Sequence, residues 1–385
     1  MRFAEFFAGV GLVREGLEGF GWQCVWANDI SADKMSTYVE NYGDDHFHLE
    51  DIWKVAAEPN GILPKDVFLY TASFPCTDLS VAGARAGLAG EESGTLNAVL
   101  KILEQKKLAN DLPKVVMLEN VSGFLTSHGG KDVAETVKVL SELGFVIDII
   151  ELDAALFTPQ SRPRVFLIAV LEAIATRFMH VKNADDLFDS WWQKFDEQPK
   201  LRSAKLKKLI ASYEELNWGL LDIPLPEPRT AILNDIIELD IPDDSSLWWS
   251  DDRKNHLLAQ MNPAHQAKLQ AMMENSFFSY GTVFRRMRAG VSMAELRTDG
   301  IAGCLRTPRG GSSKQILVRA GNGGWAVRLL TPREYARLQG VRDSFVLPKN
   351  VHKGYFAMGD AVCVPAIEHL SKYALTPIYQ FSQTS

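Results

Sequence analysis

The sequence lacks the features that define several protein classes. No apolar run approaches the roughly 18 residues that a membrane-spanning helix requires. The four cysteines are scattered and form neither a CxxC pair nor a Cys/His cluster with metal-ligand spacing, so neither a disulfide framework nor a metal site is expected. A strand-like segment follows Met1 almost directly and is predicted to leave no room for a signal or transit peptide. We therefore expect a protein without metal in a reducing, cytoplasmic setting.

An excess of positive charge is also missing. The formal net charge is −7, from 41 Lys and Arg against 48 Asp and Glu. One stretch differs, because Phe284–Arg337 contains eleven Lys and Arg but only three acids, Glu295, Asp299 and Glu334. A locally basic segment on an acidic chain can contact nucleic-acid phosphates. A solvated surface held by salt bridges explains the pattern equally well, so composition leaves both interpretations open.

Short apolar runs alternate with helix-like segments over residues 1–171. This alternation predicts an α/β fold with a mostly parallel sheet covered by helices. Helices are expected to begin near Val10, Ser31, Thr95 and Asp132, with Ser31 as the N-cap of the second. The predicted strands are Arg2–Phe7, Gln23–Asn28, Val67–Ala72, Lys114–Leu118, Val146–Leu152 and Arg164–Val170.

Beyond the alternating region, the chain divides into an insertion and a return. Residues 172–325 are predicted to form a smaller, irregular domain, and residues 326–385 to rejoin the first domain. Within the insertion we expect a charged helical stretch, a linker and Gly- and Arg-rich loops, at Asp185–Asp222, Leu225–Arg229 and Ala302–Gly324 respectively.

Regular structure is predicted to return near Thr331. Thr331, Pro332 and Glu334 have the spacing of a capping box with proline at the first helical position. A helix over Pro332–Gln339 is therefore expected.

A glycine-containing loop follows the first predicted strand. In FFAGVG, Gly9 and Gly11 let the backbone turn tightly and approach a ligand closely. The spacing matches neither GxGxxG nor a phosphate-binding GxxxxGK[ST] loop, so an ordinary strand–helix turn is at least as good an explanation. Asp29 ends the second strand, where an acid can bind ribose hydroxyls, and Asp51 follows the next short run, where it could hold an adenine edge. Each acid alone is more often a cap or a turn residue.

Cys76 is the candidate nucleophile. It follows Pro75 just past a predicted strand, at the sheet edge where ligands gather. A free cysteine is by default a small buried hydrophobe, and it needs nearby positive charge or a helix N-terminus to react near neutral pH. The following run Val81–Gly94 contains four glycines and is predicted to close over a substrate, although a disordered surface loop has the same composition.

Polar residues follow two further strands. Glu119 and Asn120 end an apolar run, which places the acid at the sheet edge, where it could be tuned as a proton donor. Gln160, Arg162 and Arg164 alternate as the chain enters another strand, so we expect all three side chains to point to one face.

These motifs together resemble the DNA (cytosine-5)-methyltransferase family of the prokaryotic restriction–modification type. FFAGVG, FPC, ENV, QSRPR, LLTPREYARLQGV and YFAMGDAV resemble that family's motifs, in the family's order and over essentially the whole length. The resemblance implies a Rossmann-like S-adenosylmethionine-dependent methyltransferase sheet, with a target-recognition domain inserted at residues 172–325 before the C-terminal motifs. The catalytic and cofactor-binding domain would then be residues 1–171 and the return 326–385.

The resemblance also implies catalytic roles. Cys76 would add to cytosine C6, and Glu119 would bind the exocyclic amine and protonate the adjacent ring nitrogen. Arg164, with Arg162, would hold the base carbonyl, and Gln160 and Asn120 complete the implied set. The base is inaccessible in stacked duplex and would be extruded.

The implied cofactor is S-adenosyl-L-methionine. Phe7 would stack on adenine, Asp29 would bind the ribose and Asp51 the adenine amine. The remaining cofactor contacts implied by the motifs are Ala8, Gly9, Gly11, Leu12, Ile30, Ile52, Pro75, Leu96, Asp360 and Ala361.

Double-stranded DNA is the implied partner, and a monomer is expected. The predicted DNA contacts are Ser80, Arg85, Arg306, Arg309 and Lys314, where arginine can read guanine or bind only phosphate. A cognate restriction endonuclease would act separately. The alternatives are a tRNA cytosine-5 methyltransferase, and a binding protein that keeps the fold without catalysis; the intact Cys76 and Glu119 argue against the latter.

The sequence departs from the family pattern at a few positions. Thr77 follows the nucleophile where glutamine is usual, Ser93 replaces an arginine, and Leu12 replaces a glycine. Asp360 and Ala361 stand where the family usually has asparagine and serine. At this position the side chain would face the carboxylate of the cofactor, which an aspartate would repel. We therefore expect Asp360 to contact the cofactor's amino group instead. None of these changes removes a group that the chemistry needs.

Overall fold

The computed structural model describes residues 1–75, 94–182, 190–288, 290–307 and 314–384. The chain forms two compact units. The first contains Met1–Leu152, Pro163–Glu227 and Ala366–Ser385, and the second contains Asp153–Arg162 and Pro228–Pro365. The predicted linker Leu225–Arg229 spans one of these boundaries, as expected. The two units are described in turn.

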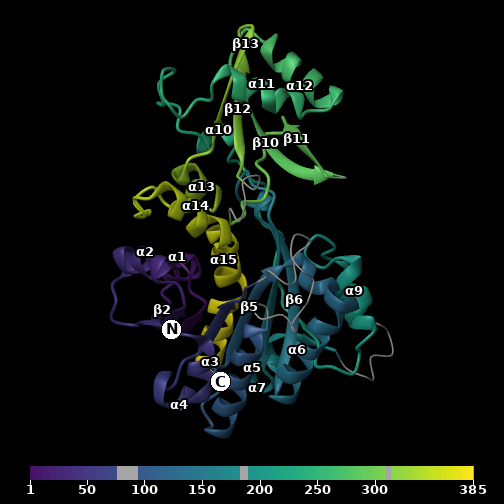
Figure 1. Cartoon of the computed structure of the whole chain (residues 1–385). Helices are drawn as coiled ribbons and strands as arrows, with labels where there is room; N and C mark the ends of the chain where they lie inside the picture. The colour runs from purple at the N-terminus through teal and green to yellow at the C-terminus, as the bar shows by residue number, and fades with distance from the viewer. Residues whose placement is uncertain (76–93, 183–189, 289, 308–313, 385) are drawn as a thin grey trace. The chain divides into compact units, whose positions relative to one another are not determined.

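The first unit is built on a seven-stranded sheet of order β3-β2-β1-β4-β5-β7-β6. Strands β1 to β5 pair in parallel, whereas β7 runs antiparallel to β5. Figure 1 shows several of these strands beside the flanking helices. The α/β prediction is confirmed, and only the short β3 was missed, because three residues show no periodicity. The strands are β1 Arg2–Phe6, β2 Gln23–Asp29, β3 Phe47–Leu49, β4 Leu69–Ser73, β5 Val115–Val121, β6 Phe145–Asp153 and β7 Pro163–Leu171.

The helices of this part begin close to their predicted positions. The Ser31 side chain accepts a hydrogen bond from the Lys34 backbone N–H, which confirms Ser31 as an N-cap. Helix α5 contacts both α3 and α6, so these three lie side by side along the sheet. The helical segments are α1 Leu12–Glu18, α2 Ala32–Tyr42, α3 Ile52–Ala57, α4 Pro59–Ile62, α5 Thr95–Leu108, η2 Ser122–Gly130, α6 Lys131–Glu142 and η3 Ala154–Leu156.

Residues 172–227 belong to the first unit, which corrects the predicted domain boundary at residue 172. Their apolar side chains, among them Trp191, Phe195 and Trp218, are buried in the core beneath the sheet. A buried ion pair between Arg202 and Asp148 of β6, with 2.5 Å between Nη2 and Oδ2, also joins this segment to the sheet. In the described part of the predicted helical stretch Asp185–Asp222, the structure has short elements, α8 Ser190–Asp196, α9 Ala204–Ala211 and β9 Gly219–Leu220. Helix α7 Glu172–Phe178 and strand β8 His180–Val181 precede this stretch.

The second unit contains a four-stranded antiparallel sheet of order β11-β10-β12-β13. Helices α11 and α12 cover one face, where Leu257, Leu269, Val283 and Val318 join one core. The expected irregular domain is therefore wrong, because β12 crosses the predicted loop region. Both faces of β12 are largely buried, so no alternation marked it. The elements are α10 Leu233–Ile236, α11 Asp251–Ala259, α12 Pro263–Met273, β10 Ser279–Arg288, β11 Val291–Arg297, β12 Ile316–Gly321 and β13 Gly324–Leu329.

The C-terminal return begins later than predicted. Residues 326–365 remain in the second unit, and only Ala366–Ser385 rejoin the first. The capping box is confirmed, since Thr331 and Glu334 bond to each other's backbone N–H groups. In the first unit, Trp22 Nε1 donates to Thr376 Oγ1 over 3.0 Å. The segments are α13 Pro332–Leu338, α14 Val351–Asp360, α15 Val364–Leu370, η4 Ser371–Leu375 and α16 Thr376–Gln383. Among the described residues no helix is long and apolar enough to cross a membrane.

Candidate active site

The chain leading to Cys76 is held by a neighbouring strand. Strand β4 ends at Ser73, opposite Glu119 of β5, and the chain continues through Phe74 and Pro75. Asn120 Nδ2 donates to the Phe74 carbonyl oxygen over 3.0 Å. Since Asn120 is buried, this bond fixes the backbone two residues before Cys76. Cys76 itself lies outside the described residues.

Glu119 and Arg164 form an ion pair at the ends of adjacent strands. Arg164 Nε lies 3.1 Å from Glu119 Oε1. The antiparallel register of β5 and β7 sets Val121 opposite Arg164, which brings the two side chains together. Glu119 is only 7% exposed, so the pair interacts at an effective dielectric well below that of water. The structure thus brings together two residues that the sequence analysis named separately.

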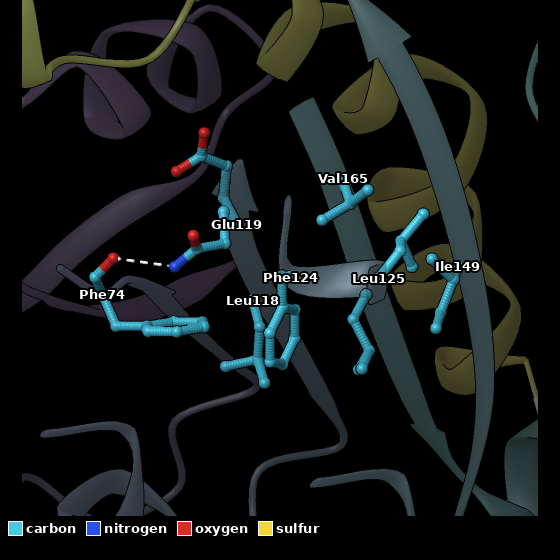
Figure 2. A pocket seen from close by; sticks show the side chains of 9 residues that line it. Phe74, Leu118, Glu119, Phe124, Leu125, Ile149 and Val165 are labelled. Atoms are coloured by element: carbon cyan, nitrogen blue, oxygen red, sulfur yellow. Dashed lines mark hydrogen bonds between the residues drawn. The ribbon is translucent and has the colours of Figure 1, made fainter. Parts of the chain in front are cut away.

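A small, mainly apolar pocket lies beneath this pair. Figure 2 shows the Glu119 carboxylate directed away from the rings and methyl groups of Phe124 and Leu125. Such a wall excludes water from one side of the carboxylate, which strengthens its interactions with partners on the other side. The lining residues are Phe74, Leu118, Glu119, Asn120, Phe124, Leu125, Ile149, Val165 and Leu167.

Gln160 and Arg162 bind Leu305, whereas Arg164 pairs with Glu119, so the three side chains that were expected to share one face have different partners. Gln160 and Arg162 belong to the second unit and are buried. Arg162 donates to the Leu305 carbonyl oxygen, and Gln160 Oε1 accepts from the Leu305 N–H. The alternation rule applies within a strand, and β7 begins only at Pro163. The Arg162 guanidinium donates to the backbone carbonyl oxygens of Leu305, Gly359 and Ala361, and its Nη1 lies 3.6 Å from Cys304 Sγ.

The two glycines of the FFAGVG loop serve different purposes. Both have positive φ, +58° at Gly9 and +85° at Gly11. A side chain at Gly11 would lie 2.6 Å from the Tyr42 ring, so packing requires glycine there. At Gly9 the nearest atoms lie 4.0 Å away, which leaves space for a ligand against the backbone.

Asp29 organises the turn beside that space. Its Oδ2 accepts the Gly9 N–H and its Oδ1 accepts the Ser31 N–H, both over 2.9 Å. Each carboxylate oxygen retains a further lone pair for a ligand hydroxyl. Asp51 is the N-cap of α3, where it accepts the Trp53 N–H over 2.9 Å.

The other predicted cofactor residues divide by exposure. Ile30 is 72% exposed beside Asp29, and Phe7 adopts a left-handed backbone with φ of 56°. Pro75 is partly exposed. The side chains of Ala8, Leu12, Ile52 and Leu96 are buried in the first unit.

Glu5 was missed by the sequence analysis. It lies in β1, two residues before Phe7, and is buried. Burial raises the pKa of the Glu5 carboxyl to about 8, against the opposing charge of Arg14. Its Oε2 accepts no hydrogen bond from the described residues. An acid inside an apolar strand gives no periodic signal, which is why the sequence pattern did not reveal it.

Asp360 lies at the end of α14 and accepts a hydrogen bond from Thr307 Oγ1. The following Ala361 offers its carbonyl oxygen to Arg162 Nη2 over 2.8 Å. Both predicted cofactor residues thus make contacts within the second unit.

Five arginines in the basic stretch of the second unit are neutralised by acidic partners. Arg286, Arg297, Arg319, Arg328 and Arg337 form ion pairs with Glu295, Asp299, Asp243, Glu334 and Asp343. The salt-bridged alternative raised by the sequence therefore describes much of this stretch.

The Arg-rich loop, residues 305–315, has one basic residue near each end whose contacts differ from those of the paired arginines. Arg306 is exposed, and Lys314 Nζ lies 4.6 Å from the centre of the Tyr355 ring. The described residues give neither of them a carboxylate partner. Ser80, Arg85, Arg309, Thr77 and Ser93 lie outside the described residues, as does the predicted closing loop Val81–Gly94 except for Gly94.

Comparison with known proteins identifies the family. The model of the C-5 cytosine-specific DNA methylases matches residues 1–375. The chain belongs to this family. It is similar to the Type II methyltransferase M.DsaV of Dactylococcopsis salina, 26% identical over 98% of this chain and 87% of that protein. It is also similar to M.Bsp6I of a Bacillus species, 25% identical over 97% of this chain and 98% of that one. The S. pombe Dnmt2 methyltransferase shares the fold, with a TM-score of 0.60, 19% identity and coverage of 99% and 98%.

The family confirms the predicted enzyme class, DNA (cytosine-5)-methyltransferase, and the cofactor, S-adenosyl-L-methionine. The first unit fits this cofactor. The open backbone at Gly9 and the remaining lone pairs of Asp29 offer a place for the ribose, and the exposed Ile30 offers an apolar surface for a base.

Proposed function

We propose that this enzyme methylates carbon 5 of a flipped-out cytosine in a specific double-stranded DNA sequence through a covalent Cys76 adduct. The observation that carries this proposal is the Glu119–Arg164 ion pair, next to the backbone that Asn120 holds directly before Cys76. A nucleophile, a proton donor and a cation at neighbouring strand ends are what addition to a cytosine ring requires.

The chemistry proceeds in three steps. The Cys76 thiolate forms a bond to C6 of cytosine, while Glu119 delivers a proton to the ring nitrogen that gains the electron pair. The enamine-like C5 then takes the methyl group that S-adenosyl-L-methionine would supply, and the methyl–sulfur bond breaks so that the neutral thioether S-adenosyl-L-homocysteine leaves. A base then removes the C5 proton, the electron pair restores the C5–C6 double bond and expels the Cys76 thiolate, and the ring nitrogen returns its proton to Glu119.

Arg164 and the apolar pocket have supporting roles. The guanidinium of Arg164 can hold the cytosine carbonyl and stabilise negative charge during addition. Its ion pair positions the Glu119 carboxyl, and the apolar wall behind that group keeps water away. Because C5 and C6 are inaccessible in stacked duplex, the base must leave the helix at a cost of a few kcal/mol.

The second unit is proposed as the target-recognition part, with Arg306 and Lys314 flanking the loop that contacts DNA. The similarity to Type II methyltransferases supports a role in restriction–modification, with a separate cognate endonuclease. We propose that the enzyme acts as a monomer in the cytoplasm, where genomic DNA is found.

The test starts with unmethylated genomic DNA and labelled S-adenosyl-L-methionine. Modified bases are mapped by bisulfite sequencing for wild type, for Cys76→Ser and for the matched control Cys24→Ser. Burial raises the pKa of the Cys24 thiol to about 12, so that cysteine is not a nucleophile near neutral pH. We expect 5-methylcytosine at one short motif with wild type and the control, and a loss above about 1,000-fold with Cys76→Ser.

Two further readouts test the adduct and the flipping. A duplex with 5-fluorocytosine at the target should remain covalently attached to wild type, because fluorine replaces the proton that must leave. 2-Aminopurine at the target position should gain fluorescence on binding, since it leaves the stack. Label entering tRNA instead of DNA would move the function to RNA, and label entering neither would indicate a silent relative.

A further inference from the structure

Arg162 joins three backbone segments of the second unit. Its Nη1 donates to the Leu305 carbonyl oxygen over 2.7 Å. Its Nη2 donates to the carbonyl oxygens of Gly359 and Ala361 over 3.2 and 2.8 Å. The side chain is only 2% exposed. One planar guanidinium therefore connects the residue before Arg306 to the C-terminal end of α14.

Two glutamines extend this connection. Gln160 Oε1 accepts the Leu305 N–H over 3.2 Å, and its Nε2 donates to the Leu338 carbonyl oxygen over 2.9 Å. Gln339 Nε2 donates to the Met358 and Ala361 carbonyl oxygens over 2.8 and 3.0 Å. Both N–H and C=O of Leu305 are thus held by buried side chains.

The backbone at Arg306 and Thr307 is held against α14. A side-chain carbon at Gly359 would lie 2.6 Å from the Arg306 carbonyl carbon, so only glycine permits this approach. Thr307 Oγ1 donates to Asp360 Oδ1 directly beside it. The first stem of the Arg-rich loop, Leu305–Thr307, is therefore fixed by two contacts with α14 as well as by Arg162.

The second stem is joined to the first through Gln315. Its Oε1 accepts the Gly303 N–H over 3.1 Å, and its Nε2 donates to the Cys304 carbonyl oxygen over 3.4 Å. The Gln315 N–H is bonded to the Tyr335 hydroxyl over 2.8 Å. The positions of Arg306 and Lys314, which begin and end the loop, are consequently set by one connected network.

We propose that Arg162 is a positioning residue for target recognition, acting through the Leu305–Thr307 stem rather than on the cytosine. Its guanidinium donates to three backbone carbonyl oxygens and to Cys304 Sγ, all within the second unit, and the side chain is only 2% exposed. The inference rests on the proposed recognition role of the second unit. Base reading is worth about 1–3 kcal/mol per good contact and needs placement within about 0.5 Å, so a displaced stem should cost discrimination.

The experiment compares Arg162→Lys with Arg164→Lys in the full-length enzyme. Lysine keeps the charge but cannot replace a planar group that bonds in two directions. The probes are a duplex with the mapped methylation site and duplexes with one changed base pair in it. We measure kcat, kcat/KM for each duplex, and the Kd for S-adenosyl-L-methionine by calorimetry.

For Arg162→Lys we expect the ratio of kcat/KM between correct and altered sites to fall about tenfold. At saturating correct DNA, kcat should change by less than about threefold, because the chemical groups lie in the other unit. Arg164→Lys should give the opposite result, with kcat reduced by at least about tenfold and the ratio retained.

A loss of kcat in Arg162→Lys equal to that in Arg164→Lys, with the site ratio unchanged, would overturn the proposal. If Arg162→Lys fails to fold, Thr307→Val is measured against Thr307→Ser, which keeps the hydroxyl. Only the valine variant should lose discrimination, and equal behaviour of the two would also count against the proposal. Failure of the proposed function is distinguishable, because wild type itself would then show no DNA methylation or no preferred site.

Discussion

Arg162 and Arg164 are separated by one proline yet belong to different units and have different partners. Arg164 forms an ion pair with the Glu119 carboxylate at the sheet edge. Arg162 donates to backbone carbonyl oxygens around Leu305 and α14. Both residues are arginines of the same motif, so neither the residue type nor the position in the motif decides the role. The partner decides the role. An arginine paired with a carboxylate at a pocket can take part in chemistry, whereas an arginine bonded to backbone carbonyl oxygens fixes the position of the backbone.

The same contrast applies to the buried acids of the two units. Glu119 is paired to one arginine nitrogen beside an apolar pocket. Glu334 is fully buried and receives two bonds from Arg328, over 2.5 and 2.7 Å. It also accepts the Thr331 N–H in the capping box. In the first arrangement the carboxylate lies at a pocket, whereas in the second both carboxylate oxygens are bound within the fold and the group contributes to stability.

The largest expected effect tests this contrast between Glu119 and Glu334. Glu119→Gln should lower kcat by about 100-fold or more, because the amide cannot donate the required proton, with little change in melting temperature. Glu334→Gln leaves the buried Arg328 charge without compensation, at a cost of about 3–5 kcal/mol, so it should lower the melting temperature instead. Steady-state methylation and thermal unfolding of both variants check this. A catalytic loss in Glu334→Gln without destabilisation would remove the distinction.

A smaller effect is expected from the arginines of the basic stretch. Arg306 is exposed at the base of the loop, whereas Arg286 Nη2 lies 2.7 Å from Glu295 Oε2. Arg306→Ala should weaken DNA binding about tenfold, through loss of either a base contact or a phosphate contact. Loss of a phosphate contact would also reduce the dependence of log affinity on log salt concentration by about one. Arg286→Ala should change affinity by less than about threefold. Binding isotherms at several salt concentrations distinguish these outcomes, and equal losses in both variants would contradict the assignment of the loop.

The smallest effect concerns Glu5, a buried acid without the compensation that Glu334 has. Its pKa is about 8 in the folded protein and near its ordinary value of about 4.3 when unfolded. Between these two values the folded state holds a proton that the unfolded state has released, so stability falls as pH rises through this window. Above pH 8 the loss is complete.

Glu5→Gln removes this ionisation. The variant should therefore melt higher than wild type at pH 9, by about 3 °C, and at the same temperature as wild type near pH 4. Calorimetric scans across this range measure the difference. If the difference in melting temperature between Glu5→Gln and wild type is the same at every pH, Glu5 does not titrate in this window.

The sequence alone determined the local features of this protein. The alternation of apolar runs predicted the sheet of the first unit, and single residues predicted the Ser31 cap and the Thr331 capping box. The motif order identified the family and placed Glu119, Asn120 and Arg164 at strand ends. These features depend on neighbours a few residues away or on a sequence signature, so they can be read from the sequence.

Tertiary structure decided which distant groups meet. Whether residues 172–227 joined the first core, whether an arginine met Glu119 or Leu305, and whether basic residues were neutralised could not be read from spacing. Arg162 and Ala361 are 199 residues apart in the chain. Such contacts depend on how the whole chain folds, because burial and partner choice are set by surfaces that come together only in the folded protein.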